Sequence, residues 1–230
     1  EPGSEEEAQA FSIPPWQRAA AGAETNSQPL PADEMPASVE DGGPLNWQIS
    51  GVTGGLNLRA APSTSAEILT TYPPDTILDN LGCQQCEDRR WCDVQRFGGG
   101  PRGYVAAEYL KAAISPKGAA IMGPDDSALR AGRSEFDATG PIPCAQHRGQ
   151  PMGSCEFGVA RKGGGYATVV ITKPDGAKRA IFFRMGAAVG ADTSQADGYP
   201  EFRATKENDL HMIRVGDERY EIPDAVVLGG

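Results

Sequence analysis

The feature that most constrains the fold of this chain is a series of short β-forming runs between Leu45 and Ala113, each ended by Pro, Gly or Asp. Within these runs apolar and polar residues alternate, as they do in half-buried strands. We expect strands over Leu56–Leu58, Ile68–Thr71, Thr76–Leu81, Trp91–Arg96 and Gly103–Val105. Short strands joined by tight turns indicate a small β-barrel, because closure of a barrel protects the strand edges.

A second β domain is predicted from residue 136 onward. The turn sequences Gly163–Gly165, Pro174–Gly176 and Gly216–Asp217 each separate two runs of β-type residues. Successive hairpins of this kind favour an antiparallel meander. We therefore expect a mainly antiparallel sheet of roughly five to seven strands here, and a mainly β fold for the chain as a whole.

The stretch between the two β domains indicates a linker with a short helix near Ser127–Arg133. Asp125 and Asp126 precede this helix and are placed to cap its first turn. The expected organisation is a disordered acidic tail, a small barrel, a linker and a second β domain, over residues 1–44, 45–113, 114–135 and 136–230.

Most of the acidity of the chain belongs to the predicted tail. Of 31 acidic residues, nine lie in residues 1–45 against Arg18 alone, so the rest of the chain is close to neutral. A tail rich in Ala, Pro, Glu, Gly and Ser cannot offset the entropy of ordering. Because no part of the chain carries a basic surplus, we exclude nucleic acid and anionic membranes as main partners. We expect no transmembrane segment.

One motif stands out within the tail. Phe11, Ile13, Pro14, Pro15 and Trp16 place apolar side chains around a stiff Pro-Pro step that favours an extended conformation. This motif is a candidate for docking to a partner. The alternative is that the tail tucks against its own domain.

Five cysteines indicate an oxidising compartment, because four of them lie close together in pairs. Cross-strand pairing of Cys83 with Cys92 leaves Cys86 odd, and Cys86 with Cys92 is the next pairing. In the second domain Cys144 pairs with Cys155. Cys83-Gln-Gln-Cys86 also fits a redox C-x-x-C, although no helix N-terminus is expected beside it to lower a thiol pKa.

Several separated pieces of the first β domain resemble the bacterial SH3-like family. Leu56-Asn-Leu-Arg59 with Ala-Ala-Pro-Ser63 is similar to its LNVRSGPS signature, although Ala61 stands where glycine is usual. Trp91 resembles the tryptophan that starts its fourth strand, Gly103-Tyr104-Val105 its Gly-Trp-Val, and Tyr109-Leu110 its closing pair. The resemblance covers about residues 46–113, and it implies a barrel that binds wall peptides, proline-rich segments or other proteins.

Five residues of this region are candidates for a ligand-binding groove. Arg59, Tyr72 and Tyr109 combine an extended body with a polar tip, which suits contact with an extended peptide. Trp91 and Tyr104 are candidates as well, but a small barrel also uses large aromatic residues to fill its core. For these two residues the core interpretation is favoured.

The chain lacks a convincing catalytic or metal-binding constellation. Its two histidines, His147 and His211, lie in the second domain without the spacing of metal ligands. Asp192–Gly198 carries oxygen ligands but fails the spacing of a calcium loop and suits a polar turn better. We therefore expect a non-enzyme with no cofactor and no metal.

The sequence predicts an exported bacterial protein, periplasmic or secreted, with its signal peptide removed. Its expected role is to bind a peptide, a peptidoglycan fragment or an envelope protein, in one version as an accessory subunit of an envelope complex. The alternative is an enzyme, either a thiol-disulfide oxidoreductase that uses Cys83 and Cys86 or an unrecognised hydrolase in the C-terminal domain.

Overall fold

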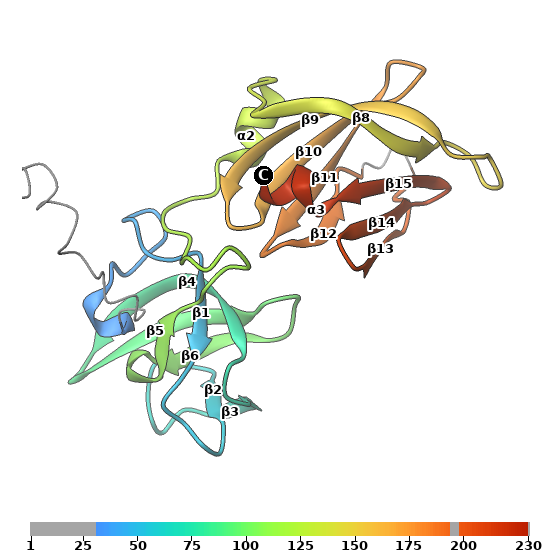
Figure 1. The fold of residues 1–230 in the computed structure, drawn as a ribbon. Helices are drawn as coiled ribbons and strands as arrows, with labels where there is room; N and C mark the ends of the chain where they lie inside the picture. The colour runs from blue at the N-terminus through green and yellow to red at the C-terminus, as the bar shows by residue number, and fades with distance from the viewer. Residues whose placement is uncertain (1–30, 194–197, 230) are drawn as a thin grey trace, which may run out of the picture.

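The computed structural model describes residues 31–193 and 198–229, which form two antiparallel β-sheet units joined by the segment around residues 113–126 (Figure 1). We call them the N-terminal sheet and the C-terminal sheet. The fold is mainly β, as the sequence predicts.

The N-terminal sheet has seven strands in the order β3-β2-β6-β5-β4-β1-β7, and every neighbouring pair is antiparallel. Strands β2 to β6 match the five expected strands, and β4 and β5 extend further than expected. Strands β1 and β7 were not predicted. The elements of this unit are η1 (Ala32–Glu34), β1 (Asn46–Ile49), β2 (Leu56–Arg59), β3 (Ile68–Tyr72), β4 (Ile77–Cys86), β5 (Arg89–Arg96), β6 (Arg102–Ala106), η2 (Ala107–Tyr109) and β7 (Leu110–Ala112).

The apolar alternation of these strands builds one core. In β2, Leu56 and Leu58 are buried in it, whereas Asn57 and Arg59 point to the other face of the sheet. Trp47 of β1 is fully buried in the same core. The outer face of the N-terminal sheet is the face that carries Asn57 and Arg59.

The segment predicted as a disordered tail becomes ordered well before residue 44. Ala32 in η1 is fully buried in the core of the N-terminal sheet. Arg90 of β5 donates hydrogen bonds to the carbonyl oxygens of Ala32, Asp33 and Met35 at 2.9, 3.1 and 2.9 Å. These contacts to backbone groups have no signature in composition, so the sequence did not indicate that residues 32–35 pack against this sheet.

The C-terminal sheet has eight strands, in the order β12-β11-β10-β9-β8-β15-β14-β13, one more than the upper end of the expectation. It curls into a nearly closed barrel in which its end strands β12 and β13 approach each other (Figure 1). The elements are α2 (Ser127–Gly132), β8 (Ala138–Ala145), β9 (Gly153–Gly163), β10 (Tyr166–Thr172), β11 (Lys178–Arg184), β12 (Ala187–Ala191), β13 (Phe202–Glu207), β14 (Leu210–Val215), β15 (Glu218–Pro223) and α3 (Asp224–Leu228).

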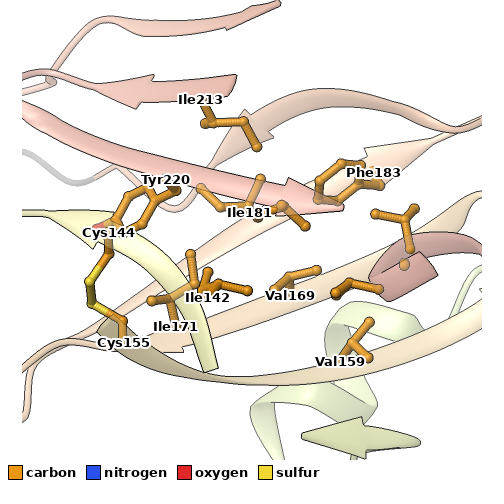
Figure 2. Packing of buried hydrophobic residues seen from close by; sticks show 14 of the residues in the cluster. Ile142, Cys144, Cys155, Val159, Val169, Ile171, Ile181, Phe183, Ile213 and Tyr220 are labelled. Atoms are coloured by element: carbon orange, nitrogen blue, oxygen red, sulfur yellow. A yellow bond between two sulfur atoms is a disulfide. The ribbon is translucent and has the colours of Figure 1, made fainter. Parts of the chain in front are cut away.

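The core of this barrel is aliphatic and aromatic (Figure 2). Ile142, Val169 and Ile181 come from three strands and are at most 3% exposed. The disulfide between Cys144 of β8 and Cys155 of β9 lies at one end of this core (Figure 2).

The short helix α2 begins at Ser127, as expected, but only one of the two predicted capping residues forms a hydrogen bond to the helix N-terminus. Asp125 Oδ1 accepts a hydrogen bond from the Ser127 backbone N–H at 2.9 Å. Asp126, at the N-cap position, makes no side-chain capping bond. Asp126 was therefore wrong as a cap, because Asp125 already satisfies the first free N–H of the helix.

Polar side chains join the two units. Tyr166 of β10 is buried and donates its hydroxyl hydrogen to Asn46 Oδ1 of β1. Burial raises the pKa of Tyr166 to about 12. The hydroxyl therefore stays protonated at neutral pH and can serve as this donor.

Candidate functional site

A groove of about 430 Å³ lies on the outer face of the N-terminal sheet, where β2, β5 and η2 meet. The turn after β1 and the strands β2 and β5 all contribute lining residues. Its lining residues are Gly51, Val52, Thr53, Gly55, Leu56, Asn57, Arg59, Thr64, Arg89, Trp91, Ala106 and Tyr109.

The structure brings three of the five predicted ligand-binding residues into this groove. Arg59, Trp91 and Tyr109 all line it, although they come from three separate elements of the sequence. Tyr72 does not, because it is only 8% exposed and packs in the core of the sheet. Tyr104 lies opposite Arg59 on the neighbouring strand but outside the groove lining.

Trp91 is buried, as the core interpretation expected. It is 4% exposed, although the apolar cluster on the inner face of the sheet takes Cys92 and Val94 from β5 and does not include Trp91. Alternate residues of a strand face opposite sides of the sheet, so Trp91 lies on the outer face. The side chain is therefore almost inaccessible to solvent although Trp91 is part of the groove lining.

A charged pair stands beside this tryptophan. The Arg89 guanidinium lies 6.0 Å from the centroid of the Trp91 ring, at the outer limit of a cation–π contact. Arg89 Nη2 also lies 3.4 Å from Glu108 Oε1, and both side chains are about 40% exposed. The groove lining thus combines two aromatic residues with the cation Arg89, and the carboxylate of Glu108 lies beside Arg89.

Arg59 has a second task, which is to hold the loop after β2. Its Nη1 donates to the carbonyl oxygen of Ala66 at 2.8 Å. Gly103 lets β6 approach this strand, because a Cβ at that position would lie 2.5 Å from the Arg59 carbonyl oxygen. The glycine of the Gly103-Tyr104-Val105 motif therefore sets the close packing that places Arg59 at the groove.

A second, more polar hollow of about 520 Å³ is also lined by Arg89. Arg89 is common to both linings, and the second hollow includes Asp33 and Ala37 of the ordered N-terminal segment. The lining of the second hollow is Asp33, Ala37, Cys83, Gln84, Gln85, Asp88, Arg89, Arg90 and Glu108.

Arg89 and Asn57 of the groove and Glu108 of the second hollow are residues that sequence reasoning missed. Two of them could have been found from strand periodicity, because Arg89 precedes Trp91 by two residues and Asn57 precedes Arg59 by two. Glu108 had no such signal, since it lies in the short helix η2.

The favoured pairing of Cys83 with Cys92 is confirmed. Cys83 and Cys92 are register partners on β4 and β5 and form a disulfide, and Cys86 is free and half-buried. The C-x-x-C of Cys83 and Cys86 therefore does not close on itself. Within residues 31–193 and 198–229, no His, Cys, Asp or Glu side chains gather as a metal-binding group.

Other sequence candidates fall beyond the described part of the chain. Phe11, Ile13, Pro14, Pro15 and Trp16 lie outside the described residues, as does most of the Asp192–Gly198 turn. Among the residues that are described, no helix has the length and apolar character needed to cross a membrane.

Comparisons with known proteins agree with the geometry of the N-terminal sheet. The family model of the bacterial SH3 domain matches residues 54–111, which include β2 to β6 and most of the groove. Searches of curated proteins and of solved structures found no match to the chain. The C-terminal region has no assigned family. Residues 54–111 of the chain are therefore a bacterial SH3 domain, a type that is typically a binding domain in cell-wall-associated proteins.

Proposed function

We propose that this protein is an exported, non-enzymatic bacterial binding protein whose SH3 groove holds an extended peptide segment of the cell envelope. The observation that carries the proposal is the convergence of Arg59, Trp91 and Tyr109 in one groove on the outer face of the sheet. An extended peptide can stack on aromatic side chains while its polar groups bond to neighbouring donors.

The groove and the second hollow together support a peptide more than a compact ligand. Arg89 lines both the aromatic groove and the polar hollow, so a ligand that contacts Arg89 can reach residues of both. Arg89 and Glu108 offer opposite charges, at a separation of 3.4 Å. A peptide with one apolar or proline residue followed by charged residues matches this order of surfaces.

The two disulfides and the bacterial SH3 domain are consistent with an extracytoplasmic protein. We assign it to the periplasm or the extracellular space. Its ligand is then a peptide of the wall or of an envelope protein, and a role as an accessory subunit of an envelope complex is one form of this proposal.

The test is a selection of ligands followed by measurement of affinity. A displayed library of short peptides and a set of wall muropeptides are screened against the full chain, and selected ligands are measured by isothermal titration calorimetry. Arg89→Ala should lower the affinity about tenfold, because it removes a charge from the middle of the surface. Arg102→Ala is the matched control, since Arg102 is an exposed arginine of the same sheet paired with Asp93 at 2.6 Å.

Two outcomes would contradict the proposal. One is that neither class of ligand binds the full chain. The other is that Arg102→Ala weakens binding as much as Arg89→Ala, because the groove would then not be the binding surface.

A further inference from the structure

The C-terminal sheet carries a row of three arginines that the proposed function does not use. Arg203 of β13 lies opposite Arg214 of β14, and Arg214 lies opposite Arg219 of β15. Directly opposed residues of antiparallel strands project to the same face of a sheet. The three guanidinium groups therefore belong to one face, and we call them the arginine row.

The arginine row lies on the outside of the barrel. Ile213 and Tyr220, which are next to Arg214 and Arg219 in sequence, point into the apolar core (Figure 2). Their arginine neighbours must therefore point away from the core. Arg214 is exposed, in agreement with this placement.

The arginine row lines a cavity of about 340 Å³. Thr205, Met212 and Glu221 form the adjacent row on the same face, and Met152 closes one side. The two methionines give the cavity an adaptable apolar wall next to the charged one. A ligand with an apolar backbone and several anionic groups fits this arrangement.

The charges of the row are only partly balanced within the described part of the chain. Arg203 pairs with Glu201 at 2.8 Å, and both side chains are about 70% exposed. Arg214 has no ion pair with a described residue. Arg219 donates from Nη2 to the carbonyl oxygen of Gln150, and its Nε is buried without a hydrogen-bond partner among the described residues.

Such an arrangement is unfavourable in the free protein. Like charges directly opposite one another on neighbouring strands destabilise a sheet, and a buried N–H without a partner adds a further penalty. Glu221 supplies one carboxylate to the cavity against the three guanidinium groups. An anionic ligand would relieve the repulsion between the guanidinium groups, since these groups bind carboxylates through paired hydrogen bonds.

We propose that the arginine row is a binding site for an acidic peptide segment of a partner protein. Adjacent strands are about 4.8 Å apart, so the row extends over roughly 10 Å and a single small anion cannot contact all of it. A peptide that carries successive carboxylates can contact all three arginines as it crosses the strands. Clusters of arginine are a recurring means of recognising acidic peptide motifs.

The experiment uses the full chain and tetraglutamate as the probe, with tetraglutamine and inorganic phosphate as comparison ligands. Tetraglutamate binding should be detectable by NMR titration, should weaken as salt is raised, and should fall about tenfold in Arg214→Gln. Arg133→Gln is the matched control, because Arg133 is an exposed arginine of the same unit outside the cavity. Arg89→Ala should leave tetraglutamate binding unchanged, which separates this site from the SH3 groove.

Thermal melting provides a second readout. Arg214→Gln should raise the melting temperature of the free protein because it relieves repulsion within the arginine row. An arginine with a purely structural role would lower it.

The proposal is overturned if tetraglutamate does not bind, if phosphate binds and tetraglutamate does not, or if Arg133→Gln has the same effect as Arg214→Gln. It is also overturned if Arg214→Gln lowers the melting temperature together with binding. A last variant replaces Glu5, Glu6 and Glu7 with Gln. If it binds tetraglutamate more strongly, the arginine row binds acidic residues of the chain itself, and the proposal of a partner protein is overturned.

Discussion

Arg184 of β11 and Asp79 of β4 form an ion pair across the two units, with Arg184 Nη2 at 2.6 Å from Asp79 Oδ1. The same carboxylate oxygen accepts a hydrogen bond from Asn46 Nδ2 at 2.8 Å. Asn46 in turn accepts the hydroxyl hydrogen of Tyr166. The guanidinium of Arg184 also lies 5.3 Å from the ring centroid of Phe97. Two residues of each sheet thus form one hydrogen-bonded network that holds the units together.

Loss of this ion pair should loosen the contact between the units. Arg184→Ala removes a charged donor from a part-buried network and should lower the free energy of unfolding by about 1–2 kcal/mol. Differential scanning calorimetry should then show that the unfolding transition begins to split into two, one for each unit. Arg148→Ala is the control, because its ion pair with Asp217 is 89% and 57% exposed and should contribute less than about 0.5 kcal/mol. Equal effects of the two substitutions would contradict the account.

The disulfide between Cys83 and Cys92 should stabilise the SH3 domain. Closure of a loop of about ten residues lowers the entropy of the unfolded chain, and this stabilises the folded state by about 2–3 kcal/mol. A Cys83→Ser and Cys92→Ser double variant should lose roughly that much stability in urea titrations. Cys86→Ser should change it little, because Cys86 is in no disulfide. Peptide mass mapping that finds a disulfide between Cys83 and Cys86 would contradict this prediction.

Arg90 should hold the first described residues of the chain against the N-terminal sheet. Arg90→Ala removes three hydrogen bonds to the carbonyl oxygens of residues 32, 33 and 35 and should destabilise their attachment by about 1–2 kcal/mol. Hydrogen exchange of residues 31–37 should become faster, whereas β5 should keep its protection. Arg96→Ala is the control, since Arg96 is exposed and lies on the same strand. Unchanged exchange in Arg90→Ala would contradict the assignment.

The stability of the C-terminal barrel should depend on Glu218 at acid pH. Burial opposes ionisation of this carboxyl group, but hydrogen bonds from Arg179, Lys173 and Tyr220 outweigh it and lower its pKa to about 2. A carboxyl group whose pKa is lower in the folded state stabilises the fold above its unfolded pKa of 4.5. That contribution is lost as the pH falls from about 4.5 to about 2.

The variant Glu218→Gln should therefore be less stable than the wild type at pH 7, by a free energy on the order of 2 kcal/mol. The difference should shrink as the pH approaches 2, where the wild-type carboxyl group is protonated as well. Denaturant titrations of both proteins between pH 2 and pH 7 measure this. A difference that stays constant over the whole range would contradict the role of Glu218.

The sequence predicted the parts of this structure that depend on local pattern. The alternation of Leu56, Asn57, Leu58 and Arg59 is enough to place β2 and to show which side faces the core. The spacing of Cys83 and Cys92 across a turn is enough to favour their disulfide. Both features arise from residues that are neighbours or near neighbours in the chain.

Features that depend on register between distant segments could not be predicted. Aromatic character alone predicted that Trp91 is buried but could not reveal which face of β5 it occupies. The contact of Asp79 with Arg184 spans 105 residues, and the alignment of the arginine row requires the pairing of three strands. The arginines of that row are unremarkable in the sequence and become a site only when the strands pair.

The central claim is that the groove formed by Arg59, Trp91 and Tyr109 binds an extended peptide. The most direct measurement is an NMR titration of the full chain with the tightest ligand selected from the peptide and muropeptide screen. The account predicts that the largest shift changes fall on the Trp91 indole N–H and on the amides of residues 51–59, 89–91 and 106–109. Shift changes confined to β3, or to the C-terminal sheet, would contradict it.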